Sequence, residues 1–191
     1  MNDEPACLPT AVRILREHSA AIGFPASCED RAGALLRTLA ATKPAGLLLE
    51  IGTGTGVGTA WLLDGMSHDA RLVTIERDPD LAALARDLLG VDPRVEFATA
   101  DANDWVAAYA GPPFDLVFAD CRVGKLERRD EVLRLLRRGG IYVADDLRTK
   151  PFWAGGYQSR VDRFLAEIAT QPCLQVAVMD WASGLIVAAR S

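Results

Sequence analysis

The sequence predicts an α/β fold with a largely parallel sheet, helices on both faces and an antiparallel hairpin at the C-terminal end. Three observations predict it. Short apolar runs alternate with stretches of helical periodicity, a glycine-rich loop joins the first such run to a helix, and the last apolar stretch is interrupted by a short turn. Strands that alternate with helices form βαβ units whose parallel strands are buried on both faces.

Two helices are expected before the sheet. Residues 9–23 carry apolar side chains at helical spacing, and Pro25 then interrupts the chain. Ser27 can cap the next helix, with Asp30 three residues on as its reciprocal partner, and that helix ends before Pro44.

Strands and helices then alternate to the end of the chain. The expected strands are 45–52, 70–76, 94–100, 114–120 and 141–146, and the expected helices run from the glycine loop to Met66 and over 78–90, 101–110, 125–138 and 159–171. Gly139-Gly140 stops the helix over 125–138 in the manner of a C-cap. Residues 174–190 form two strands with a glycine-containing turn, which predicts the hairpin.

Length and composition indicate one domain, with N-terminal helices in 1–43 and a sheet core in 44–191. The net charge of −5 argues against a whole-surface role on nucleic acid or an anionic membrane. No secretory signal and no bilayer-spanning apolar run is seen, and four scattered cysteines are typical of a reducing compartment, so we expect a cytoplasmic protein. Two histidines make a zinc site of the His/Cys kind improbable.

The glycine loop has an unusual spacing. A dinucleotide fingerprint, G-x-G-x-x-G, fails because its third glycine falls on Val57 or Thr59. Instead Glu50 is followed by four glycines at alternate positions, which are Gly52, Gly54, Gly56 and Gly58. A carboxylate at this strand end repels a pyrophosphate and suits an ammonium group, so we expect Glu50 to hold the amine of a cofactor.

Acidic residues also follow the next two strands. Glu76 lies twenty residues beyond Gly56, the usual reach of an acid that accepts from ribose hydroxyls, and Asp101 is placed to accept from an adenine amino group. The alternative for Asp101 is a helix cap and nothing more. The predicted cofactor-binding set is completed by Thr53, Arg77, Ala102 and Asp120.

Taken together, these motifs resemble the class I S-adenosylmethionine-dependent methyltransferases, most closely the small O-methyltransferases related to catechol O-methyltransferase. The resemblance runs from about residue 20 to the end and is carried by LEIGTGTGVG, VTIERD, ATADAND, FDLVFAD and LLRRGGIYVADDL. It implies a Rossmann-like seven-stranded sheet with a terminal hairpin, S-adenosylmethionine as the cofactor, and methylation of a hydroxyl on a small, aromatic molecule.

The resemblance also implies a divalent cation, Mg²⁺ or else Mn²⁺ or Ca²⁺, held by Asp120, Asp145 and Asp146, all-oxygen ligands that suit such ions. Relatives carry a lysine three residues beyond the first aspartate as the general base. That position is Val123 here, and Lys125 lies two further on. Asp120 and Lys125 are the predicted catalytic residues. The alternative is that the aspartates only cap a turn and order the loop.

Phe152, Trp153 and Tyr157 follow the fifth strand, where the resemblance places the wall of the substrate site. Two alternatives stay open: a metal-independent methyltransferase for another acceptor and a non-catalytic cofactor-binding domain. A third, an NAD-dependent oxidoreductase, is opposed by the failed glycine spacing. A small-molecule substrate is expected, without nucleic acid or membrane. The N-terminal helices and the hairpin offer apolar surface for a homodimer.

Overall fold

The protein is built around one seven-stranded sheet. The computed structural model describes residues 2–148 and 155–191. The strands are β1 (Leu47–Ile51), β2 (Arg71–Glu76), β3 (Val95–Thr99), β4 (Phe114–Ala119), β5 (Leu136–Ala144), β6 (Leu174–Met179) and β7 (Leu185–Arg190). Their order in the sheet is β3-β2-β1-β4-β5-β7-β6. Strands β1 to β5 pair in parallel, and β7 is antiparallel to β5 and β6, so the predicted fold class is confirmed.

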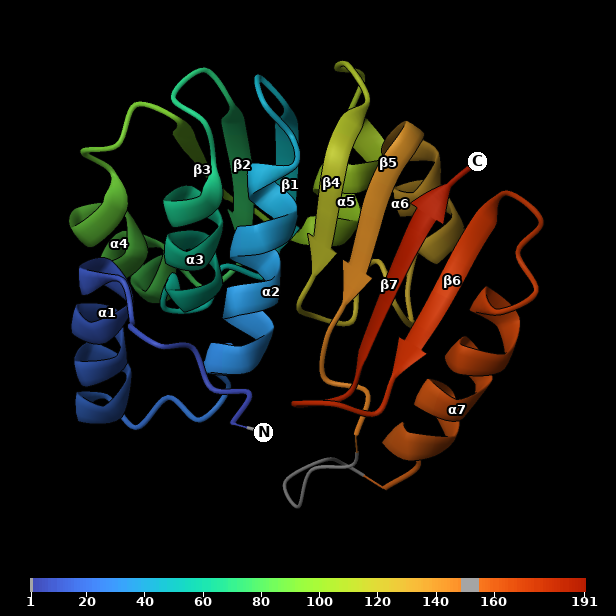
Figure 1. Ribbon diagram of the computed structural model, residues 1–191, viewed down its shortest axis with the longest axis horizontal. Coiled ribbons are helices and arrows are strands. Elements are labelled where there is room, and N and C mark those ends of the chain that lie inside the picture. Colours follow the sequence, from blue (N-terminus) through green and yellow to red (C-terminus); the bar gives the residue numbers. More distant parts are fainter. Residues whose placement is uncertain (1, 149–154) are drawn as a thin grey trace.

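Helices cover both faces of the sheet (Figure 1). They are α1 (Thr10–Ala21), α2 (Asp30–Ala41), α3 (Val57–Gly65), α4 (Pro79–Leu89), α5 (Ala102–Ala108), α6 (Arg129–Leu135) and α7 (Tyr157–Ile168). Successive strand residues alternate between two cores: Leu48 and Leu116 pack with α1, α2 and α3, whereas Leu49 and Val117 pack with α5, α6 and α7. This alternation follows from the pleat of a strand.

The predicted helix over 125–138 is wrong in its extent. Helix α6 ends at Leu135, and Leu136 already belongs to β5, where it pairs with Phe114 of β4. Gly139 therefore lies inside the strand, at φ +73°, beside a shift in the β4–β5 register. The charged residues at helical spacing favour a helix here. The stretch joins the sheet instead because the side chain of Leu136 is buried there.

The predicted cap of the second helix is also wrong. The N-cap of α2 is Glu29, with no side-chain hydrogen bond to the first turn, and the buried Ser27 hydroxyl has no hydrogen-bond partner among the described residues. By contrast α4 begins in the expected way, because the Asp78 carboxylate accepts from the backbone N–H groups of Asp80 and Leu81.

Close contacts at two glycines join α2 to α3. A Cβ atom on Gly33 of α2 would lie 2.2 Å from the Trp61 ring of α3, and one on Gly65 would lie 2.0 Å from the carbonyl oxygen of Arg37. Only glycine permits this approach, which lets the buried Trp61 ring fill the space between α2 and α3.

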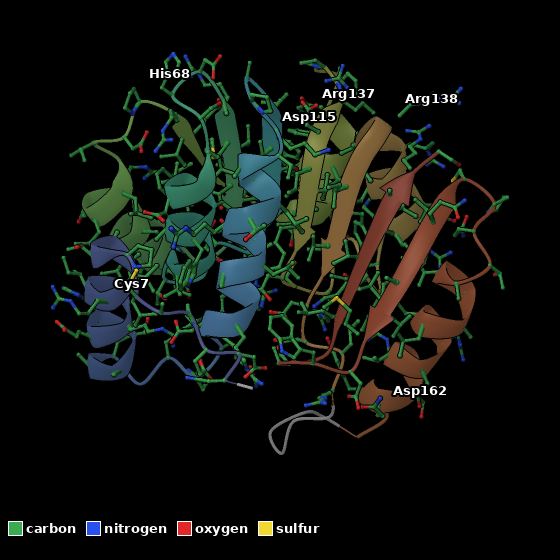
Figure 2. All side chains as sticks on the ribbon, viewed as in Figure 1. Cys7, His68, Asp115, Arg137, Arg138 and Asp162 are labelled. Atoms are coloured by element: carbon green, nitrogen blue, oxygen red, sulfur yellow. The ribbon has the colours of Figure 1, made fainter. Side chains whose placement is uncertain are left out.

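The edge of the sheet where the strands begin is charged and exposed. Figure 2 shows Asp115, Arg137 and His68 along it; Arg137 pairs with Asp115 at 2.6 Å, and Asp115 also accepts from the Leu47 N–H. In the part of the chain that is described, no helix has both the length and the apolar character needed to cross a membrane.

We predict that Gly33→Ala destabilises the protein, because its methyl group would overlap the Trp61 ring and force repacking. The free energy of unfolding, measured by urea denaturation, should fall by roughly 1–3 kcal/mol. Gly155→Ala is the matched control, since a Cβ at that position meets nothing within 4 Å. An unchanged midpoint for Gly33→Ala would contradict this packing.

Candidate active site

Two adjoining cavities open at the carboxyl ends of the parallel strands, the lower edge of the sheet in Figure 1. The glycine-loop cavity, of about 260 Å³, lies between residues 52–58 and residues 24–28. The acidic cavity, of about 400 Å³, extends past the ends of β3, β4 and β5. Their shared walls are Gly52, Glu76, Arg77, Asp120 and Cys121. Ligands of parallel sheets bind at this edge, so the joined cavities are the candidate active site.

Most residues expected in the site line these cavities. Those on the glycine-loop cavity are Gly52, Thr53, Gly54, Gly58, Glu76, Arg77 and Asp120. Those added by the acidic cavity are Asp101, Ala102, Lys125 and Asp146. Three expected residues, Glu50, Gly56 and Asp145, line neither cavity.

The glycine loop is tightly folded on itself and on β2. Gly52, Gly54 and Gly56 all have φ between +54° and +102°, a region that favours glycine. The N–H groups of Gly52 and Thr53 donate to the carbonyl of Ile75, and that of Gly56 donates to Thr53. These N–H groups are therefore hydrogen-bonded within the protein.

Glu50 lies behind the loop, with no exposed surface. Its Oε2 atom accepts from the hydroxyls of Thr59 and Thr74, and the Thr74 hydroxyl is 2.5 Å from that of Thr53. Its Oε1 atom has no partner among the described residues and occupies the space that a side chain on Gly58 would need. Burial raises the pKa of Glu50 to about 7, against the lowering effect of the two hydroxyls. These contacts favour support of the loop from beneath over the expected direct contact with a cofactor amine, which only a bound ligand tests.

Glu76 is one of the two acids, with Asp120, that line both cavities. One carboxylate oxygen accepts from the Gly54 N–H at 2.8 Å, and the other accepts from the Asp78 N–H at 3.0 Å. An ionised carboxylate has about four acceptor positions, so roughly two remain for a ligand. Glu76 therefore fixes the loop and still faces the cleft.

The N-terminal segment forms a wall that sequence reasoning missed. Phe24 packs over the loop, where a Cβ on Gly54 would lie 3.3 Å from its ring, and the Ser19 hydroxyl lies 2.7 Å from that of Thr55. Ser27 and Cys28 complete this side of the cavity. Nothing in a Pro-containing connection between two helices signals such a role, because it depends on how α1 packs beside the loop.

Asp101 serves as both a cap and a cavity wall. Its carboxylate accepts from the Asn103 N–H at 2.7 Å at the start of α5, and its side chain lines the acidic cavity. Asp101 therefore caps α5, and its contact with an adenine amino group stays a prediction.

Three aspartates crowd the far end of the cleft. Burial, followed by the charges of Asp145 and Asp146, raises the pKa of Asp120 well above its usual range. Burial and the charge of Asp146 raise the pKa of Asp145 to about 6. The ammonium group of Lys125 opposes both shifts, and its Nζ donates to the carbonyl oxygen of Asp145 at 2.5 Å.

These aspartates do not form the expected metal centre in the described structure. Asp145 is buried, and its Oδ1 accepts from the Ser183 hydroxyl and from the Asp146 N–H. Across residues 2–148 and 155–191, no group of three or more His, Cys, Asp or Glu side chains is arranged to hold a metal ion. The donor set therefore does not fit a divalent cation as the resemblance implies.

The expected aromatic wall is only partly described. Tyr157, the first residue of α7, lines the acidic cavity. Phe152 and Trp153 lie outside the described residues. Other walls that the sequence did not single out are Cys121, Asn103 and Glu127; of these, only Cys121 has a sequence signal, its place beside Asp120.

The sheet order, the glycine loop after β1 and the acid at the end of β2 define a class, the Rossmann-like proteins that bind a nucleoside at the carboxyl edge of the sheet. Residues 49–147 match a family described as a methyltransferase domain. The chain belongs to this family, which confirms the resemblance inferred from its motifs.

Individual relatives support the same family. Over 119 residues the chain is 40% identical to the catechol O-methyltransferase of Mycobacterium tuberculosis, covering 60% of this chain and 54%, about half, of that protein. The O-methyltransferase TomG from Streptomyces achromogenes, solved with S-adenosylmethionine, is 26% identical with a TM-score of 0.84, over 97% of this chain and 91% of that one. The Bacillus cereus O-methyltransferase, solved with S-adenosylhomocysteine, shares the fold. It is 24% identical with a TM-score of 0.84, over 97% of this chain and 93% of that one.

We predict that the ionisation of Glu50 destabilises the protein at alkaline pH. Its folded pKa, about 7, lies above its ordinary 4.5, so its stabilising contribution is complete below about pH 4.5 and is lost as the pH rises through 7. Between about pH 5.5 and pH 8.5 this costs roughly 2 kcal/mol of unfolding free energy.

Glu50→Gln should flatten that part of the pH dependence, measured by urea unfolding at both pH values. Glu96→Gln, which changes an exposed carboxylate on β3, should leave it as in the unmodified protein. Equal slopes for all three proteins would show that Glu50 does not titrate as described.

Proposed function

We propose that this chain transfers the methyl group of S-adenosylmethionine to a hydroxyl oxygen of a small, aromatic molecule. The observation that carries the proposal is a pair of adjoining cavities, with the folded glycine loop in one, Lys125 in the other, and Glu76 and Asp120 lining both. Such a site suits a cationic nucleoside at the loop and a hydroxylated acceptor beside it.

The loop discriminates against phosphate. Loops that hold phosphates present free N–H groups to the oxygens. Here the N–H groups of Gly52, Thr53 and Gly54 are donated to the Ile75 carbonyl and to Glu76. With two carboxylates at this point, Glu50 beneath the loop and Glu76 facing the cleft, a sulfonium nucleoside is favoured over a dinucleotide such as NAD.

The chain's own residues position both reactants. Residues 52–55 would hold the methionine end of the cofactor, Glu76 would accept from its ribose hydroxyls, and Asp101 and Ala102 would hold the adenine. The acceptor would occupy the acidic cavity, with Tyr157 on its wall. Asp120 lines both cavities, so its carboxylate would accept the hydroxyl proton of the acceptor, and the cofactor, when bound, would supply the methyl group.

The acceptor class is supported by the resemblance and by the relative from Mycobacterium tuberculosis, whose name specifies a catechol. A catechol-type diol is therefore the first acceptor to test. A cofactor-binding domain without activity is the second candidate, favoured by one observation: Val123 occupies the position of the relatives' lysine.

We also infer the setting in which the protein acts. The cysteines Cys7, Cys28, Cys121 and Cys173 are free, as expected in a cytoplasmic protein. The contact between Gly33 and Trp61 supports one methyltransferase domain over 1–191. The exposed side chains of Ile22 and Val178 supply apolar surface for a homodimer.

Calorimetry tests the cofactor and an assay tests the reaction. The protein should bind S-adenosylhomocysteine and not NAD, and it should release S-adenosylhomocysteine when given S-adenosylmethionine and a catechol-type diol. Binding of NAD alone would overturn the proposal. Binding of S-adenosylhomocysteine without transfer to a broad set of hydroxylated acceptors would favour the non-catalytic domain.

We predict that Glu76→Ala weakens binding of S-adenosylhomocysteine at least about tenfold, because charged hydrogen bonds to the ribose and to the Gly54 N–H are lost together. Isothermal titration calorimetry measures the effect. Glu96→Ala, on the exposed side of β3, is the matched control and should bind as the unmodified protein does. If both variants bind S-adenosylhomocysteine with equal affinity, Glu76 is not part of the cofactor site.

A further inference from the structure

A tight turn after β4 carries Lys125 back to the strand ends. Gly124 adopts φ +90°, its N–H donates to the Glu127 carbonyl, and its own carbonyl accepts from the buried Tyr142 hydroxyl at 2.6 Å. Val123 is buried in the core. The turn thus places Lys125, rather than the residue at the relatives' lysine position, beside the aspartates.

Lys125 is buried, with 4% of its surface exposed, and it still lines the acidic cavity. A lysine ammonium has three N–H donors, of which the Asp145 carbonyl takes one. Within residues 2–148 and 155–191, this leaves two donors for groups in the cavity. Lys125 lines the same cavity as Asp120 and Asp146, and its Nζ lies 2.5 Å from the carbonyl oxygen of Asp145, so its positive charge lies beside these aspartates.

The same carboxylates are poorly arranged for a divalent ion. Asp145 is turned toward Ser183, and within the described structure the acids do not converge on one point. A buried group of negative charges needs a compensating cation or protons. Arg77, Arg122 and Lys125 all line this cavity, but both arginines are exposed, whereas Lys125 is buried and contacts the backbone of Asp145.

We propose that the Lys125 ammonium is the fixed cation of the acceptor site and takes the place of a divalent metal ion. This inference rests on the proposed function. The ammonium donates to the acceptor oxygen and stabilises the negative charge that develops there. The O–CH₃ bond forms as the S–CH₃ bond breaks, sulfur keeps the bonding electron pair and becomes a neutral thioether, and the hydroxyl proton passes to Asp120.

Binding of Mn²⁺ tests the inference without an acceptor. Saturated with S-adenosylhomocysteine, the unmodified protein should bind Mn²⁺ no tighter than about 1 mM by calorimetry. Lys125→Met should bind it at least about tenfold more tightly, because the aspartates lose their internal counter-charge. Lys43→Met is the matched control: Lys43 also donates to a backbone carbonyl, that of Gly139. It should behave as the unmodified protein.

Methyl transfer gives a second readout. With a catechol-type diol, a chelator should change the rate less than about twofold, and Lys125→Met should lower kcat at least about 100-fold while the KM for S-adenosylmethionine stays within about threefold. Lys125→Arg keeps the charge and should retain more activity than Lys125→Met. If Lys125→Met does not fold, as judged by thermal unfolding, Lys125→Gln replaces it.

The outcomes separate the two proposals. Micromolar Mn²⁺ binding by the unmodified protein, or no gain in Mn²⁺ affinity on removal of the ammonium, overturns the role of Lys125. The proposed function still stands in that case if the protein binds S-adenosylhomocysteine and transfers the methyl group to the diol. Failure of the unmodified protein to bind S-adenosylhomocysteine overturns the proposed function itself.

Discussion

The buried Glu50 carboxylate is the constraint on which the active-site edge depends. Through the hydroxyls of Thr59 and Thr74 it joins β1 to α3 and β2, and through Thr74 and Thr53 it reaches the glycine loop. A carboxylate without solvent contact keeps its place only when donors surround it. Gly58 must lack a side chain because Glu50 fills the space beside it.

The glycine loop, held by Glu50, determines which ligand groups the glycine-loop cavity can bind. Its N–H groups are turned inward to Ile75 and Glu76, which leaves a surface suited to a cationic nucleoside rather than to phosphates. Two distant parts of the chain complete the site. The N-terminal segment brings Phe24 over the loop, and the turn after β4 brings Lys125 to the aspartates. The proposed function assigns cofactor binding to the glycine-loop cavity and acceptor binding to the acidic cavity.

Much of this could be predicted from the sequence. Short apolar runs and the turn residues predict the strands and the terminal hairpin, and the topology of a parallel sheet places Glu76, Asp101 and Asp120 at one edge. What could not be predicted depends on packing. Pairing with Phe114 draws Leu136 out of the expected helix, and the direction of the Asp145 carboxylate is set by Ser183, on a turn 38 residues away. Glu50 faces inward because its threonine partners lie behind the loop.

A crystal structure with S-adenosylhomocysteine tests the central claim most directly. The account predicts the amino-acid end of the ligand along residues 52–55, its ribose hydroxyls on the Glu76 carboxylate, and Glu50 still buried on Thr59 and Thr74 without touching the ligand. A ligand bound directly by Glu50, or a nucleoside lodged away from Glu76 with the loop N–H groups turned outward, would contradict it.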